Sequence, residues 1–503
     1  MGARAWALLL VLCGTIFLEG IDVAMLAVAI PSIRADLGLA TDTAAWVMSA
    51  YVLGYAGFTL LGGRAADLLG RRRMFLLWLT IFLLFSGLGG FATDGWTLIV
   101  ARFVTGVSAA FMTPAALSLI TTSYEEGPRR NKALLIFAGT GAGGFSLGLV
   151  IGGLLTQLGW RWVFFAPVLL AAALLIAAVR LIPAQPAPPR AKGGFDALGA
   201  ITAAGAMLLT AYGIVRLEHG FVGWPLTAGA VLAGLLLVGT FVVIERRSAA
   251  PLVRLGIFRM GSVVRADLGA LLFVGAFFGF QFVVTLYLQE LRGWSSLQTA
   301  VALVAMGCDA VLAPTLTPKL VERFGNARVI VGGFVLAVVA YALFLPVGMD
   351  WTYAAMFPTL ILAGVAFALA YGPLTIAATD GVAAHEQGLA SGLLHTATQF
   401  GSAIGISAVT AVYGLAGPDG GTGTGTDTGA EAALTAFRAA LVVPVVMVAV
   451  GLVLSGVGVW GSRGRGKRGG VYVAPSAGAT GTSGATGTSG ATGTSGSTVG
   501  SHQ

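Results

Sequence analysis

Long apolar runs, separated by short polar gaps, repeat along the chain as far as about residue 460. A membrane-spanning helix needs about 20 consecutive, mostly apolar residues, and we count fourteen runs of this kind. The pattern therefore predicts fourteen membrane-spanning helices. Their approximate cores are 5–30, 44–62, 74–92, 96–120, 133–157, 161–182, 197–216, 224–244, 266–288, 299–318, 329–347, 352–378, 390–413 and 434–460.

The composition points to the same class of protein. Of the 503 residues, 57% are hydrophobic and only 10% are charged, whereas an ordinary soluble domain carries about 25% charged residues. Such a small number of charges cannot cover a globule of this length, so most of its surface must face lipid. The first run continues through Glu19 and Asp22 to Ile30, and we interpret it as an uncleaved span and not a signal peptide. The sequence predicts an all-α polytopic membrane protein.

The positive charge is distributed in a way that sets topology. The net charge is +8, but the basic residues lie in the gaps between apolar runs and so do not predict binding of nucleic acid. If both termini are cytoplasmic, 23 of the 29 Lys and Arg residues fall on the inner side, five fall outside, and Arg102 lies within a span. This bias predicts a multi-pass protein of the cell membrane with both ends in the cytoplasm.

Several other chemistries are excluded by the sequence. Cys13 and Cys308 both lie in apolar runs and the four histidines are scattered, so no disulfide framework or metal site is expected. The segment 461–467 resembles a phosphate-binding loop, but Arg468 stands where a Ser or Thr would hold magnesium, and no strand precedes it. No nucleophile–base arrangement appears either. We therefore expect no enzyme, no cofactor and no use of ATP, and an ion gradient as the source of energy.

Two segments lie outside the predicted spans. Residues 417–430 are rich in Gly and Thr and are expected to form an external loop. A basic cluster follows the last span, and three copies of Ala-Thr-Gly-Thr-Ser-Gly occupy 479–496, a composition that predicts disorder. The cluster is expected to bind anionic lipid in preference to nucleic acid. Its members are Arg463, Arg465, Lys467 and Arg468.

An internal repeat predicts the architecture. In the gap after the second run, Asp67 is followed by Gly70 and Arg73; the same acid–Gly–Arg spacing returns 255 residues later as Glu322, Gly325 and Arg328. This offset fits two six-helix halves with a two-helix insert, and parallel halves around a midplane site are typical of secondary transporters. The expected division is an N-terminal half at 1–183, a linker with the insert at 184–260, a C-terminal half at 261–462 and a tail at 463–503.

Charges inside the predicted spans are candidates for function. Insertion of an Asp or Arg at the centre of a membrane helix costs about 2.5–3.5 kcal/mol on insertion scales. Such a residue therefore usually has a structural or functional role. Glu19 and Asp22 lie one turn apart in the first span, Arg102 lies in the fourth, and Asp309 lies in the tenth. They could couple transport to protons, or form ion pairs that hold helices together, and the sequence leaves both alternatives open.

Two further patterns have two interpretations each. In the thirteenth span His395, Gln399 and Ser402 form one polar stripe, and Gln281 lies in the ninth; these residues could line a cavity or join neighbouring helices. The fifth span carries glycines at four-residue spacing, which allow close packing of membrane helices or a flexible, gating helix. These glycines are Gly144, Gly148, Gly152 and Gly153.

The gap from Gly63 to Arg73 resembles the cytoplasmic signature loop of the major facilitator superfamily. Other segments resemble its fourteen-helix drug:H+ antiporter branch, and together they cover about residues 18 to 405. They include Asp22 with Pro31, Arg102 with Gly106, the fifth-span glycines, the segment 160–165, and Gln399 with Gly401. The chain departs from the branch pattern at Ala24, Ala27 and Thr105, and at Leu149, where a proline after the fifth-span glycine is expected.

The resemblance implies a major facilitator fold that exports lipophilic or cationic small molecules in exchange for protons and works as a monomer. Proton-coupled uptake of a metabolite, or a receptor or scaffold that transports nothing, are the alternatives. The candidate site residues, from the charge pattern and from the resemblance, fall into four groups by expected role. These are proton coupling at Asp22, Glu19, Arg102 and Asp309, conformational change at Gly63, Asp67, Gly70, Arg71 and Arg72, gating at Gly144, Gly148, Gly152 and Gly153, and a substrate cavity at Gln281, His395 and Gln399.

Overall fold

The computed structural model describes residues 2–39, 41–183, 196–216, 224–248, 251, 253–416 and 429–466. Within these ranges the structure consists of helices and their connections, without strands, which confirms the all-α prediction. The predicted linker at 184–195, nearly all of the predicted external loop and the tail beyond residue 466 lie outside the described residues. Residues 1–460 form one compact unit, which contains all of the helices as far as the end of the last predicted span.

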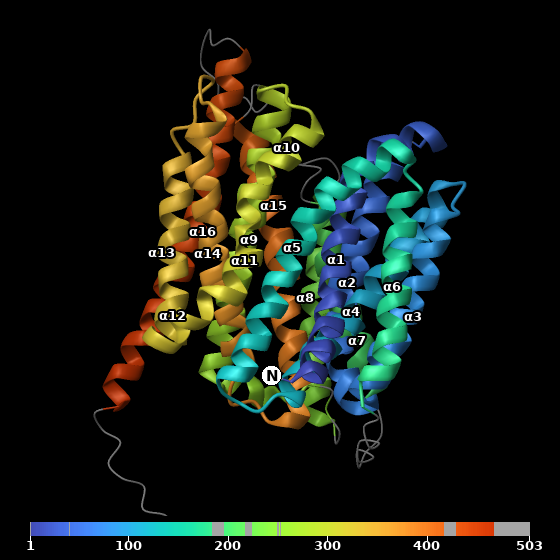
Figure 1. Ribbon diagram of the computed structural model, residues 1–503, viewed down its shortest axis with the longest axis vertical. Helices are drawn as coiled ribbons and strands as arrows, with labels where there is room; N and C mark the ends of the chain where they lie inside the picture. Colours follow the sequence, from blue (N-terminus) through green and yellow to red (C-terminus); the bar gives the residue numbers. More distant parts are fainter. Residues whose placement is uncertain are drawn as a thin grey trace, which may run out of the picture. The chain divides into compact units, whose positions relative to one another are not determined.

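Six long helices make up the N-terminal half, and the insert follows them. The N-terminal helices are α1 (Ala3–Leu37), α2 (Thr41–Leu69), α3 (Arg71–Gly90), α4 (Gly95–Ser123), α5 (Pro128–Leu158) and α6 (Trp162–Leu181). The insert consists of α7 (Ala197–Arg216) and α8 (Trp224–Arg247), which pack against each other. In Figure 1 α1 to α6 lie on one side of the unit.

The C-terminal half lies beside the first. Its helices are α9 (Gly261–Leu286), α10 (Ser296–Leu303), α11 (Asp309–Thr315), α12 (Thr317–Phe324), α13 (Asn326–Phe344), α14 (Tyr353–Thr379), α15 (Gln387–Ala416) and α16 (Gly429–Gly466). Helix α7 contacts α2 of the first half and α15 of the second, so the insert lies across one of the two lines along which the halves meet.

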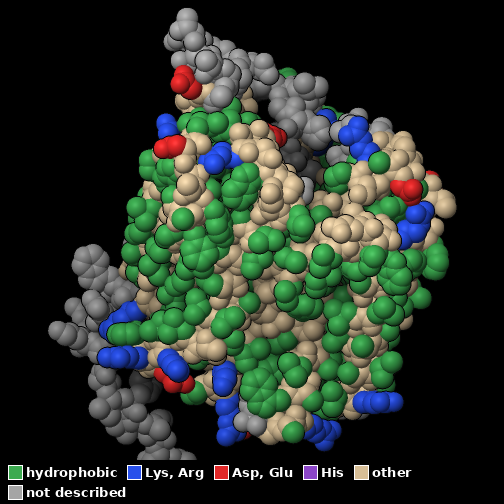
Figure 2. Space-filling view, turned by 45° about the horizontal axis from the view of Figure 1, so that its top comes forward, with side chains coloured by type: hydrophobic (Ala, Val, Ile, Leu, Met, Phe, Trp, Pro, Cys, Tyr) green, Lys and Arg blue, Asp and Glu red, His purple; other side chains and the backbone are tan. Residues whose placement is uncertain are grey.

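Twelve of the described helices are long and apolar enough to cross a membrane. Helices α2 and α7 are not among the twelve, which were found among the described residues, with the segment from α10 through α11 as one span; in α7 the fully described apolar stretch is Leu198–Ile214. Apolar side chains cover the flank of the helices, while charged side chains gather toward the two ends (Figure 2). Large apolar residues such as Leu84, Leu169 and Ile176 are exposed there, as expected of a multi-pass membrane protein whose flank contacts lipid.

The predicted tenth span is not one continuous α-helix. Between α10 and α11 the backbone tightens into a 3₁₀ segment, Val304–Cys308. Gly307 in this segment lies against Ser146 of α5, and Gly364 of α14 lies against the backbone of Met306. Glycine is a poor helix former, and α5 and α14 both pack closely against the backbone here. The regular α-helix is therefore interrupted in the middle of the span.

The internal repeat has a structural counterpart. Gly70 and Gly325 each precede a helix, α3 and α13, and both have positive φ angles, 99° and 84°. Only glycine adopts such angles without strain, which explains why it recurs at the same place in the two repeats. The two halves therefore turn at equivalent points.

Glycines also set the closest helix contacts. Gly144, Gly148 and Gly152 of α5 lie against the backbone of α1 at Phe17, Ile21 and Met25. In the second half, Gly401 and Gly405 of α15 lie against α9 in the same manner. Of the alternatives for the fifth-span glycines, close packing is present in this conformation, and Gly153 faces Leu297 of α10 instead.

We expect Gly405→Ala to destabilise the protein by about 1–3 kcal/mol, the usual cost of an extra methyl group in a packed core. The new Cβ would lie 2.8 Å from the Cα of Gly275, in contact with backbone that has no room to move. The matched control is Gly239→Ala in α8, where a Cβ meets nothing within 4 Å. Thermal unfolding of both purified variants measures the difference, and equal stabilities would contradict the packing described here.

Candidate functional site

The first half contains a buried ion pair between two helices. Arg102 of α4 donates from Nη1 to Oδ2 of Asp22 in α1 over 2.5 Å, and each side chain is only 3% exposed. In an apolar interior an ion pair is screened far less than in water, while removal of one partner leaves a buried, uncompensated charge at a cost of about 3–5 kcal/mol. The structure thus brings together two of the predicted proton-coupling residues, which are 80 residues apart in the chain.

Two tyrosines of α2 extend this pair. The Arg102 guanidinium carbon lies 4.4 Å from the centre of the Tyr51 ring, a cation–π contact. The Tyr55 ring meets the Tyr51 ring edge-on at 6.0 Å, and the Tyr55 hydroxyl donates to Glu19 over 3.0 Å. Glu19 also accepts a hydrogen bond of 2.9 Å from Thr113 of α4. One continuous cluster therefore joins Asp22, Arg102, Tyr51, Tyr55 and Glu19, and we call it the buried polar cluster.

Tyr51 and Tyr55 are not among the site residues that the sequence predicted. Both hydroxyl-bearing rings lie on one face of α2, because residues four apart share a helix face. One pattern could have identified them. It is a pair of tyrosines at this spacing, in the predicted span that comes after the span with the two buried acids. The acids themselves were found because charge in a span is conspicuous, whereas tyrosine is common at many places in membrane helices.

The predicted residues of the second half do not join this cluster. Asp309 begins α11 and is 1% exposed, and its Oδ2 has no hydrogen-bond partner among the described residues. His395 contacts the Ser391 carbonyl oxygen through Nδ1 over 3.0 Å. Within the described chain, no hydrogen bond links Gln281, His395 and Gln399 to one another, and His395 Nε2 and Gln281 Oε1 are buried without a partner.

The signature loop joins the two halves. Asp67 accepts hydrogen bonds from the backbone N–H groups of Gly388 (3.1 Å) and Leu389 (3.0 Å) at the start of α15, and forms an ion pair of 2.9 Å with Arg71. The first turn of a helix has free N–H groups and a positive partial charge, so a carboxylate is well placed there. Gly63 lets α2 approach, since a side chain at this position would meet Gly388 and Gly392.

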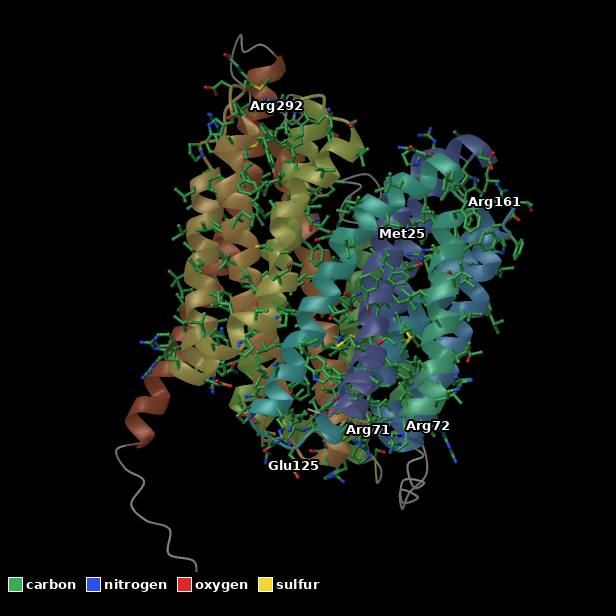
Figure 3. All side chains as sticks on the ribbon, viewed as in Figure 1. Met25, Arg71, Arg72, Glu125, Arg161 and Arg292 are labelled. Carbon is green, nitrogen blue, oxygen red and sulfur yellow. The ribbon has the colours of Figure 1, made fainter. Side chains whose placement is uncertain are left out.

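The arginines of the loop have different partners. Arg71 donates to the Ala384 carbonyl oxygen of the second half, whereas Arg72 donates to the carbonyl oxygens of Ile182 (2.9 Å) and Val179 (3.2 Å) at the end of α6. Figure 3 shows Arg71 and Arg72 at the same end of the helices as Glu125, and Arg161 and Arg292 at the opposite end. We call the former the loop end of the bundle.

A second contact between the halves was not predicted. Arg130, in the first turns of α5, is 4% exposed and donates to the carbonyl oxygen of Thr379, the last residue of α14, over 2.8 Å. Glu126 holds the same guanidinium at 2.9 Å. Gln387 of the second half donates to the same carbonyl oxygen over 3.1 Å. The Glu126–Arg130 spacing was visible in the sequence, but nothing there distinguished it from an ordinary loop at the membrane surface.

The repeat of the signature loop is not used in the same way. Glu322 corresponds to Asp67 in spacing, yet it is exposed on α12, and within the described part of the chain it has no ion pair. It lines a cavity of about 250 Å³ together with Trp6, Arg129 and Lys132 of the first half. At the loop end, α2 and α15 are therefore joined by direct hydrogen bonds, while α12 packs against α5 with this small cavity beside the contact.

The fold agrees with the comparisons with known proteins. A family model described as the Major Facilitator Superfamily matches residues 12–406. The puromycin resistance protein pur8 of Streptomyces alboniger is 34% identical over 420 residues, which cover 81% of this chain and 82% of that protein. The cephamycin export protein CmcT of Amycolatopsis lactamdurans is 33% identical and covers 82% of this chain and 86% of its own.

Two further comparisons point the same way. The multidrug efflux pump LfrA of Mycolicibacterium smegmatis is 29% identical over 82% of this chain and 81% of its own length. The crystal structure of the human organic anion transporter MFSD10 matches the fold with a TM-score of 0.63 at 16% identity, covering 89% of this chain and all of that one. The chain belongs to the Major Facilitator Superfamily of membrane transporters, as the resemblance of its signature loop implied.

For the signature loop we expect Asp67→Asn and Gly70→Val each to slow transport severalfold while expression and substrate binding persist. Asparagine weakens the contact with the start of α15, and valine at a φ of 99° strains the turn. Transport rates and binding affinities of the purified variants, reconstituted in liposomes, check this. Normal rates in both variants would reduce the loop to a topology device.

Proposed function

We propose that this chain exports lipophilic or cationic small molecules across the cell membrane in exchange for protons. The observation that carries the proposal is the buried Asp22–Arg102 ion pair within the first half of a major facilitator fold. A charge pair away from water is costly and is rarely retained in a membrane span without a role. A carboxylate that can be neutralised by one proton is the simplest switch for such a pair.

The names of the relatives support the direction of transport. They describe puromycin resistance, cephamycin export and multidrug efflux, and all three proteins align over four fifths or more of this chain. Export accounts for these names better than proton-coupled uptake does, and a receptor or scaffold would have no use for an acid that can gain and lose a proton. We therefore favour export over uptake and over a receptor or scaffold role.

Proton exchange would work through the charge balance of the buried polar cluster. With Asp22 ionised, the guanidinium of Arg102 is neutralised and the cluster retains the acid Glu19 for a cationic compound. A proton that enters from outside neutralises Asp22, ends the ion pair and favours release of the compound. The proton then leaves on the inside, so that one proton moves in for each exchange. Asp309 of the second half is the alternative proton carrier.

The energy of this exchange is sufficient for export. A driving force of about 150 mV supplies roughly 3.5 kcal/mol per proton, since 100 mV corresponds to about 2.3 kcal/mol. At about 1.4 kcal/mol per tenfold, one proton could hold a neutral compound several hundredfold out of balance. No ATP is needed for a gradient of this size.

We further propose that all fourteen predicted runs cross the membrane and that the loop end of the bundle is cytoplasmic. Helix α2 packs along α4 in the interior of the first half, although it is not among the twelve candidate spans. The 20 residues of α7 reach about 30 Å at about 1.5 Å per residue, the thickness of the hydrocarbon core. Both termini then lie in the cytoplasm, and the protein functions as a monomer.

Reporter fusions test this topology. Fusions after Arg468 and within 184–195 should report the cytoplasm, and a fusion near residue 420 should report the outside, because thirteen spans would precede that loop. Phosphatase and fluorescent-protein reporters at the three positions give opposite readouts. A cytoplasmic location for residue 420 would contradict the fourteen-span arrangement without affecting the family assignment.

For coupling we expect Asp22→Asn to abolish uphill export but to permit downhill exchange, because the neutral amide imitates only the protonated state. Arg102→Lys should also fail, since lysine is a point charge without the planar fork of arginine. The measurement is efflux of a lipophilic cation from proteoliposomes driven by a pH gradient, with and without an uncoupler.

The matched control is Asp36→Asn on the same helix, α1. Asp36 pairs with Arg161 at the surface, where its side chain is 51% exposed, and such pairs contribute little; export by this variant should equal that of the wild type. Wild-type accumulation by Asp22→Asn would exclude Asp22 as the proton carrier and leave Glu19 or Asp309 in its place. A wild-type protein that moves no compound in either direction would contradict the export function itself.

A further inference from the structure

Two polar atoms of the stacked Tyr51–Arg102 pair have no partner. The hydroxyl oxygen of Tyr51 and the Nε of Arg102 are both buried, and within the described chain neither takes part in a hydrogen bond. Each residue is 2% exposed, so bulk water does not reach them in this conformation. A buried donor without an acceptor is costly, and most buried polar groups in proteins are paired. The two atoms therefore need an acceptor that the neighbouring side chains do not supply.

The hydrogen bonds found at the neighbouring carboxylates involve other donor atoms. Asp22 accepts from Nη1 of Arg102, and Glu19 accepts from Tyr55 and Thr113. An arginine Nε–H can only donate, whereas a tyrosine hydroxyl can donate or accept. An oxygen atom beside the pair is a suitable acceptor for either group. The missing partner is thus a hydrogen-bond acceptor and not a donor.

Charge balance decides which acceptor fits. Asp22 already neutralises the guanidinium, and Glu19 lies within the same cluster. An anionic ligand would add negative charge to a site that already carries two carboxylates, so a neutral oxygen is favoured. A ketone or amide carbonyl is neutral, accepts two hydrogen bonds and is common in lipophilic compounds.

We propose that the Tyr51 hydroxyl and the Arg102 Nε form a subsite for a carbonyl oxygen of the transported compound. This inference rests on the proposed export function and specifies the chemistry that the site recognises. The guanidinium carbon lies 4.4 Å from the centre of the Tyr51 ring, and Nη1 binds Asp22. With these two contacts made, the guanidinium presents Nε in one direction. Loss of the ion pair on protonation of Asp22 would free the guanidinium and dismantle the subsite, which links recognition to release.

The test uses two cations that differ only in an acceptor. Tetraphenylphosphonium has no hydrogen-bond acceptor, and its derivative with one acetyl group on a ring adds a single ketone oxygen. We expect the wild-type protein in liposomes to bind the acetyl derivative about tenfold more tightly than the parent cation, the effect of one hydrogen bond of about 1.4 kcal/mol. Tyr51→Phe, which keeps the ring, should remove most of this preference, so that the two cations bind this variant with nearly equal affinity.

Two further variants separate recognition from structure. Tyr51→Leu removes the ring as well, so binding of both cations should weaken because Arg102 loses its support. Tyr341→Phe is the matched control: Tyr341 is a fully buried tyrosine of α13 whose hydroxyl also lacks a partner among the described residues, and the tenfold preference should survive its change. Binding of the parent cation by Tyr51→Phe shows in the same experiment that this variant is folded.

The outcomes distinguish the two levels of the proposal. A full tenfold preference in Tyr51→Phe, or no preference in the wild type while the parent cation still binds, overturns the subsite and leaves the export function standing. An equal loss of preference in Tyr341→Phe also overturns the assignment to Tyr51. A wild-type protein that binds neither cation overturns the export of lipophilic cations, and the subsite with it.

Discussion

The structure of the first half depends on one requirement, that a guanidinium and a carboxylate within an apolar bundle must meet. Asp22 and Arg102 can pair over 2.5 Å only if α1 and α4 are held at a fixed rotation and separation. Gly54, Gly62 and Gly106 lie where α2 and α4 touch, and a side chain at any of them would strike the backbone of the other helix. Close packing thus brings the Tyr51 ring over the guanidinium, and the cluster follows from helix contacts made by glycine.

The contacts between the halves are of a different kind. Asp67 and Arg130 both bind the backbone ends of helices in the opposite half, at the loop end of the bundle. Asp67, Arg130 and Thr379 are buried in this conformation, so these hydrogen bonds are costly to break unless water replaces them. The apolar contacts inside each half have no comparable substitute. The bundle therefore combines two halves packed by apolar contacts with a junction of hydrogen bonds to helix ends.

The sequence predicted the helices, the repeat and the family, because hydrophobic length, the Asp67–Gly70 spacing and buried charge are local features. It also identified Asp22 and Arg102 as costly, but not as partners, since a partner 80 residues away depends on the rotation of packed helices. Tyr51, Tyr55 and Arg130 were missed for the same reason: each has an ordinary residue type at its position, and its contacts alone make it notable. The 3₁₀ segment at Val304–Cys308 was also not predicted, because it lies where α5 and α14 pack closely against one glycine-containing segment.

The insert makes the two lines of contact between the halves unequal. Along the line between α2 and α15, α7 packs against both helices, Tyr212 stacks on Trp46, and Ser407 donates to the carbonyl oxygen of Ile214 over 3.0 Å. Along the other line, Gly139 and Gly143 of α5 face small residues of α11, and Val311 beside them is 65% exposed on the flank. The contact between α5 and α11 therefore rests on small residues, whereas the line between α2 and α15 includes α7 as a third helix.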